Sequence, residues 1–219
     1  MEYRILCRPS YSLLELRLRD GEEVVAETGA MVYMKNVELK TEVKGGLLKG
    51  LKRSLFGGES FFVNRFVSKG EGVLGLAPRY LGDIIHIPVN GRLYAQSGAF
   101  LASTPEIEID TKWGGAKTFF AGEGLFLLKL EGHGDVFLSS FGGIEVIEVE
   151  DHLVVDTGHI VAFEDGLDFK VSRVGGLKTT LLSGEGLVAE FRGQGKVWIQ
   201  TRSIGEYIGW IASLLPSRD

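Results

Sequence analysis

A glycine-marked segment that occurs three times constrains the fold of this chain more than any other feature. The copies are residues 28–32, 97–101 and 157–161, and each has a Thr-Gly or Ser-Gly step before a mostly apolar run. A glycine pair follows each of these glycines 16 or 17 residues later. Landmarks that keep their order and spacing indicate internal duplication. The chain is therefore predicted to contain three copies of one small unit.

Two further glycine steps support the same division of the chain. A Gly-Glu step recurs in each copy, and each unit then closes with a Gly-x-Gly step, at residues 70–72, 132–134 and 193–195. Apolar and polar residues alternate at 106–110 and 167–171, which is the period of half-buried strands. Many short strands with glycine-bearing turns are typical of sandwiches and barrels. We therefore predict an all-β fold.

The domain boundaries follow from these landmarks. Units of about 60 residues bury too little surface to be stable alone, so we expect one compact domain whose subdomains share a core in a pseudo-threefold arrangement. The predicted subdomains are 1–77, 78–140 and 141–202, with a short C-terminal helix at 203–215. Ser203 and Glu206 have the spacing of a helix capping box, and Pro216 supplies a stop.

One segment belongs to the first unit alone. Residues 47–56 are an insertion that the other two units lack, with leucines on one side of a predicted helix and Lys49, Lys52 and Arg53 on another. The surrounding window, residues 40–69, has a net charge of +5, whereas the whole chain has −5. This basic face is too small to predict nucleic-acid binding, which needs a basic domain or a long basic stripe.

The composition indicates a cytoplasmic protein. The 219 residues include a single cysteine, Cys7, which cannot form an internal disulfide bond. Charged residues interrupt the first eleven positions, so no apolar signal core is expected there. No stretch reaches the roughly 20 apolar residues of a membrane-spanning helix.

Several segments together resemble the AIM24 family, formerly a domain of unknown function. They are residues 156–163, Gly-Gly-Leu-Lys at 175–178, Gly-Glu-Gly-Leu at 184–187, and the ending at 195–202. The first-unit stretch from Gly45 to Phe61 resembles the family as well, so the match covers essentially the whole chain. The resemblance implies three tandem TRAP-like β-sandwich subdomains, related to the tryptophan RNA-binding attenuation protein. It implies no reaction and no catalytic residue.

The residues themselves indicate neither an enzyme nor a metal or cofactor site. The four histidines and the single cysteine lack metal-ligand spacing, and no phosphate-loop pattern or nucleophile elbow occurs. His159 attracts attention because alanine stands at the equivalent place in the other two units. Single histidines are usually half-buried packing residues, and that is the interpretation we favour.

A polar set that recurs in all three units is the candidate ligand site. Side chains gathered about a common axis could hold a polar ligand or an ion. The alternative, which we favour, is that they bond to the amides of the turns beside each glycine. The set comprises Glu27, Thr28, Gln96, Ser97, Asp156, Thr157 and His159.

Two amphipathic segments suggest contact with a membrane or a protein partner. Lys49, Lys52, Arg53 and Phe56 of the insertion would face an anionic surface. The C-terminal helix has an apolar stripe edged by Trp210, but such stripes more often cover the open end of a β core.

These observations predict a non-enzymatic, homo-oligomeric scaffold or binding protein, a trimer or ring, peripheral to membranes. Repeated β units present edge strands that must be paired or covered, which is why association is expected. The alternative is a small-molecule-binding protein with sites between the subdomains, by analogy of fold.

Overall fold

The computed structural model describes residues 1–40, 61, 63–111, 126–173 and 187–216. These residues form β-strands and one short α-helix at the C-terminus, so the predicted all-β class with a terminal helix is confirmed. The basic insertion, with Lys49, Lys52, Arg53 and Phe56, lies outside the described residues.

The first unit is organised around one long strand. Its strands are β1 (Glu2–Leu6), β2 (Leu13–Leu18), β3 (Glu23–Glu27), β4 (Met31–Lys40) and β5 (Val63–Leu76). β5 pairs with β3 along its first half and with β2 along its second half, while β4 pairs with both halves. All these pairings are antiparallel, and β1 adds an edge strand beside β2.

The second unit repeats this plan with fewer breaks. Its elements are β6 (Ile84–Gln96), the 3-10 turn η2 (Ser97–Ala99), β7 (Phe100–Ser103), β8 (Ile107–Asp110) and β9 (Leu127–Ser139). β9 takes the place of β5, and β6 pairs with it along its whole length. β7 and β8 together take the place of β4.

The third unit has the same pairings with its long strands divided. Its elements are β10 (Ile144–Val149), β11 (His152–Asp156), the 3-10 turn η4 (Thr157–His159), β12 (Ile160–Glu164), β13 (Leu167–Arg173), β14 (Leu187–Gly193) and β15 (Gly195–Gln200). β14 and β15 together correspond to β5.

The Gly-x-Gly steps mark the bends of these long strands. Gly70, Gly132 and Gly193 have φ values of 86°, 147° and 110°, which side chains with a Cβ rarely adopt. The sequence interpretation that these steps close the units is wrong, because strand pairing within the same unit continues beyond each of them, in the third unit as the separate strand β15.

The marker glycines, Gly29, Gly98 and Gly158, each lie two residues after the last residue of a strand. Gly98 and Gly158 lie in the 3-10 turns η2 and η4, and the residues before those turns have nearly the same φ and ψ, −65° and 138° against −60° and 134°. Gly29 differs, because it has a positive φ of 88°. The strand that follows each turn has a bulge at Val32, Leu101 or Val161.

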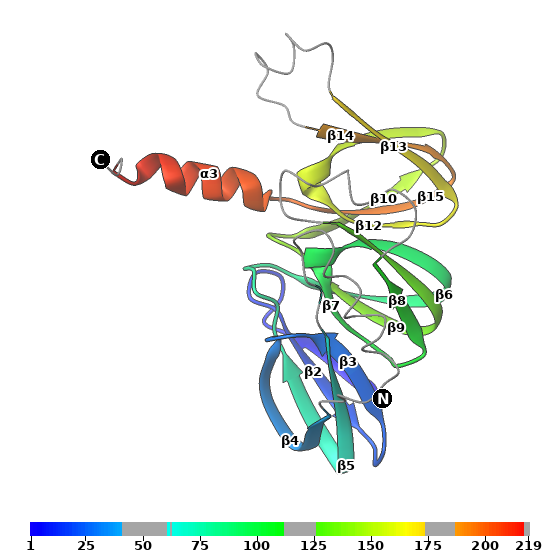
Figure 1. Cartoon of the computed structure of the whole chain (residues 1–219), viewed down its shortest axis with the longest axis vertical. Coiled ribbons are helices and arrows are strands. Elements are labelled where there is room, and N and C mark those ends of the chain that lie inside the picture. The colour runs from blue at the N-terminus through cyan, green and yellow to red at the C-terminus, as the bar shows by residue number, and fades with distance from the viewer. Residues whose placement is uncertain (41–60, 62, 112–125, 174–186, 217–219) are drawn as a thin grey trace.

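The units form a row along the long axis of the molecule (Figure 1). β3 pairs with β7 at the first junction, and β6 pairs with β12 at the second. No pairing among the described strands joins the third unit back to the first. The strands described in a single chain therefore do not close into the pseudo-threefold arrangement expected from the sequence.

Neighbouring units share their hydrophobic cores. The first core includes Leu101 and Ala102 of the second unit, and the second core includes Val161 and Ala162 of the third. The third core in turn includes Leu127 from the second unit. Apolar burial therefore stabilises the junctions as well as the units.

Candidate functional site

The recurring polar set lies at three separate strand ends. Glu27, Gln96 and Asp156 are the last residues of β3, β6 and β11, each opposite the first part of the long strand of its own unit. Because the units form a row, the set is spread along the molecule (Figure 1). No hydrogen bond or ion pair among the described residues links members in different units.

Two members of the set accept hydrogen bonds from backbone amides, and one of these bonds lies within the member's own turn. Asp156 accepts a hydrogen bond from the Gly158 amide at 2.8 Å, and the Ser97 hydroxyl accepts one from the Phe126 amide at 3.3 Å. Gln96 and Thr157 are buried. The Asp156 contact is of the kind that holds a turn, whereas Gln96 Nε2 is buried without a hydrogen-bond partner among the described residues.

His159 is held by the end of the last strand. Its Nδ1 lies 2.7 Å from the carbonyl oxygen of Gln200, and a carbonyl only accepts, so Nδ1 carries the proton. The Gln200 side chain donates to the Gly158 carbonyl at 2.8 Å and accepts from the Phe141 amide at 2.9 Å. His159 is therefore part of a bonded frame that joins the third turn to β15.

Glu27 has a different environment from Gln96 and Asp156. Arg79 approaches its carboxylate at 3.4 Å and also donates to the Thr28 carbonyl at 3.2 Å. Burial raises the pKa of Glu27 above its usual value, and the positive charge of Arg79 opposes this rise without cancelling it. The first unit thus carries an ion pair where the third unit carries a turn bond.

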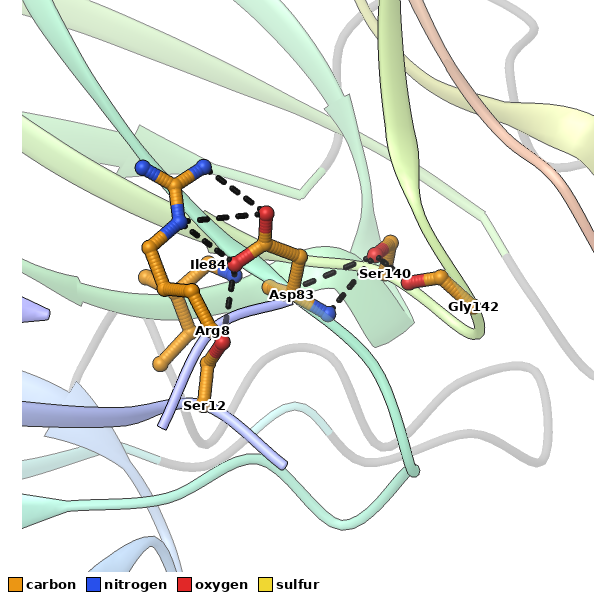
Figure 2. A network of polar contacts seen from close by, with 6 residues as sticks. All are labelled: Arg8, Ser12, Asp83, Ile84, Ser140 and Gly142. Atoms are coloured by element: carbon orange, nitrogen blue, oxygen red, sulfur yellow. Dashed lines mark hydrogen bonds and ion pairs between the residues drawn. The ribbon is translucent and has the colours of Figure 1, made fainter. Parts of the chain in front are cut away.

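A buried residue that the sequence analysis missed, Asp83, contacts the first unit through its carboxylate and the third unit through its backbone amide (Figure 2). Asp83 accepts bonds from Arg8 Nε at 2.9 Å, Arg8 Nη2 at 2.7 Å and the Ser12 hydroxyl at 2.8 Å. Its own amide bonds to the Gly142 carbonyl at 3.1 Å and to the Ser140 hydroxyl at 3.2 Å. Arg8 and Ser12 precede β2, Asp83 precedes β6, and Gly142 precedes β10. Asp83 therefore connects the segments that precede β2, β6 and β10.

These bonds also set the charge of Asp83. Burial alone would raise its pKa, but the hydrogen bonds from Arg8, Ser12 and the Ile84 amide outweigh burial and lower the pKa below the usual range. The carboxylate is thus ionised and fully bonded near neutral pH. Its contacts are those of a structural junction.

The C-terminal helix, α3 (Ile204–Leu214), extends away from the β body (Figure 1, red). The buried hydroxyl of Ser203 caps it by accepting from the Glu206 amide at 3.4 Å, as the capping-box spacing predicts. Near its base, the Tyr207 ring packs on Phe141 with centroids 5.2 Å apart.

None of the residues of α3 is buried. Trp210 is 58% exposed and Leu214 is 65% exposed. The interpretation that this stripe covers the end of the β core is therefore wrong. The physical reason is that the core of the third unit is already closed by its own strands, with Phe163 and Phe191 at most 1% exposed.

Two surface hollows lie within units. One, of about 500 Å³, is lined by Arg17, Arg19, Lys35 and Glu71 of the first unit among others. Another, of about 610 Å³, is lined by residues of the third unit that include Glu148, Glu164 and Lys196. Neither hollow corresponds to the small-molecule site between subdomains that the sequence offered as an alternative.

No helix in the described part of the chain is long and apolar enough to cross a membrane. Among the same residues, no cluster of three or more His, Cys, Asp or Glu side chains could hold a metal ion.

Comparison with known proteins identifies close relatives over the full length. Residues 3–202 match the model of the family described as mitochondrial biogenesis AIM24. An uncharacterised protein of Streptococcus pyogenes serotype M6 is 32% identical over 228 residues, which cover 99% of this chain and 92% of the relative. A crystal structure of a Streptococcus pyogenes protein is similar with a TM-score of 0.81 and 30% identity, covering 98% of this chain and 99% of that one.

Proposed function

This chain belongs to the AIM24 family, and we propose that it is a non-enzymatic, oligomeric scaffold or binding protein, peripheral to membranes. In this proposal, a row of three TRAP-like β-sandwich units forms the rigid body, and α3 is the contact element. The polar side chains of Asp156, His159 and Asp83 are already hydrogen-bonded within the protein. The support for a binding role therefore comes from the exposed surface of α3.

The exposed apolar face of α3 is the observation that carries the proposal. Tyr207, Ile208, Trp210, Ile211 and Leu214 are each at least 37% exposed on a helix with one charged residue, Glu206. Exposed apolar surface of this kind marks an interaction site, and Trp and Tyr favour the boundary between lipid and water. A lipid surface would cover these side chains while leaving the β body in water.

The base of α3 is fixed, which suits a contact element. Ser203 caps the helix from a buried position, and the ring contact between Tyr207 and Phe141 joins it to the start of the third unit. A helix anchored in this way loses less conformational entropy on binding than a free segment does.

The test is co-sedimentation of the full chain with vesicles of phosphatidylcholine, with and without phosphatidylglycerol. We expect the parent to sediment with vesicles, and Ile208→Ser with Trp210→Ser to lose most of that binding. Ser213→Ala on the same helix is the matched control and should bind like the parent. Exposed substitutions change stability by only about 0.5 kcal/mol, so all variants should unfold like the parent.

The basic insertion has its own test, based on the sequence. Replacing Lys49, Lys52 and Arg53 with Ser should reduce binding only to vesicles that contain the anionic lipid, because opposite charges attract basic residues to such surfaces. If the parent sediments with neither kind of vesicle, the membrane part of the proposal is wrong.

A further inference from the structure

The junction between neighbouring units is built twice in the same register. Ala26 of β3 lies opposite Ala102 of β7 at the first junction, and Ala95 of β6 lies opposite Ala162 of β12 at the second. In both, the third residue before the marker glycine of one unit faces the fourth residue after the marker glycine of the next. The register is therefore a property of the unit itself.

Two strand edges of the same kind are not joined within the chain. β11 corresponds to β3, and among the described strands it pairs only with β14. β4 corresponds to β7 and β12, and in the described part of the chain it pairs only with β5. Because β11 belongs to the last unit and β4 to the first, these edges lie at opposite ends of the row.

The first residues of β4 are exposed where their counterparts are buried. Met31, Val32, Tyr33 and Met34 are 38–53% exposed, but residues 100–103 of β7 and 160–163 of β12 are at most 1% exposed. Exposed apolar edge strands readily pair with other chains. If another strand covered this edge, these side chains would be removed from water, as their counterparts are in the other two units.

β11 shows the same contrast in a shorter strand. Val154 is 48% exposed, whereas Val25, its counterpart in β3, is 5% exposed. Val154 is one residue away from the position that corresponds to Ala26, so it lies where the junction strand would pair.

We infer that β11 of one chain pairs antiparallel with β4 of a second copy, in the register of the two internal junctions. This register places Val155 opposite Tyr33 and Val154 opposite Met34. The occupant is a second copy because β4 offers, at the same unit positions, the edge that β7 and β12 offer inside the chain. The inference rests on the oligomeric part of the proposed function and names the strands that form the contact.

Such a contact joins different surfaces of the two copies. Each added copy covers one β4 and one β11 and leaves the other pair of edges open. The assembly therefore runs head to tail, and it either closes into a ring or continues as a filament.

Disulfide trapping tests the register. In a Cys7→Ser background, one protein carries Val154→Cys and another carries Met34→Cys. Directly opposite residues of antiparallel strands have Cβ atoms about 4.5–5.5 Å apart, close enough for a disulfide bond. We expect mild oxidation to give covalent dimers in the mixture, at least about tenfold faster than in the control mixture of Val154→Cys with Tyr33→Cys, whose side chains would point to opposite faces.

A charge series separates the possible outcomes. Val154→Lys with Met34→Lys in one chain places like charges opposite each other, and light scattering should then show the mass falling to that of the 24.0 kDa monomer. Val154→Glu with Met34→Lys should restore the larger mass. An oligomer that survives the double lysine variant, or crosslinks faster in the control mixture, overturns this pairing but leaves an oligomeric scaffold intact. A parent that is monomeric at all concentrations overturns both, while vesicle binding by α3 is measured independently.

Discussion

β12 and β4 hold the same place in the third and the first unit, but only β12 has a neighbouring unit beside it. Each begins with an apolar residue and a valine, Ile160 and Val161 against Met31 and Val32. Both valines occupy the bulge, yet Val161 is fully buried and Val32 is more than half exposed. The sequence of a unit determines which side chains are suited to burial, and its place in the row determines which are buried.

The sharpest test of this comparison is the same substitution at both bulges. Val161→Ala should lower the free energy of unfolding by about 2 kcal/mol, because it removes buried methyl groups and leaves a cavity. Val32→Ala should change it by less than about 0.5 kcal/mol in dilute protein, since the side chain is exposed in the single chain. Urea unfolding measures both values.

Protein concentration extends that test. If β4 pairs with a second copy, the cost of Val32→Ala should rise when the chain is concentrated enough to associate. Equal costs at the two valines in dilute protein would show that position in the row does not control burial.

Smaller changes in the free energy of unfolding are expected when a buried and an exposed polar contact are each removed. Asp83→Asn weakens the buried junction with Arg8 and should lower the free energy of unfolding by about 1–2 kcal/mol, less than for a fully buried pair because Arg8 is half exposed. Lys69→Ala removes an ion pair with Glu38, 3.6 Å long and open to solvent on both sides, and should cost less than about 1 kcal/mol. A larger loss for Lys69→Ala would contradict the assignment of Asp83 as the junction that joins the units.

The smallest expected effects are those of pH on stability. The ionised side chains of Asp83 and Glu27 contribute to stability with opposite signs. The pKa of Asp83 is lowered in the folded protein, so its contribution to stability is complete above the unfolded value of about 3.9 and is lost as the pH falls through the folded pKa. The pKa of Glu27 is raised, so ionised Glu27 opposes folding above its folded pKa, and that cost disappears as the pH falls below about 4.3.

Unfolding measured across this pH range checks both signs. Asp83→Asn should be less stable than the parent near neutral pH, and the difference should shrink in acid. Glu27→Gln should be slightly more stable than the parent near neutral pH, and that difference should also shrink in acid. A destabilised Glu27→Gln protein would show that the ion pair with Arg79 outweighs the burial of the carboxylate.

Local features were predicted best from the sequence. Ser203 caps α3 where its spacing to Glu206 predicts it. The glycines at 70, 132 and 193 recur because each adopts a positive φ, although the prediction that they close the units is wrong. In each case the physical requirement lies within a few residues, so a short pattern is enough to reveal it.

Features that depend on distant partners were not predicted. Asp83 has no recurring pattern, and its main partner, Arg8, is 75 residues away. The stripe on α3 shows that one helix face is apolar, but an apolar pattern does not tell whether protein, lipid or a second chain covers it. The turn at Gly29 also differs from those at Gly98 and Gly158, although the three segments are alike.

The order of the units along the chain bears on how the protein is made. Each unit pairs with its immediate neighbours, so the first can form on the ribosome before the third has been synthesised. At each stage, the growing chain leaves one strand edge bare until the next unit emerges and covers it, as β7 covers β3 and β12 covers β6. Among the described strands none covers the outer edge of β11, so this edge stays in the state that β3 and β6 pass through briefly.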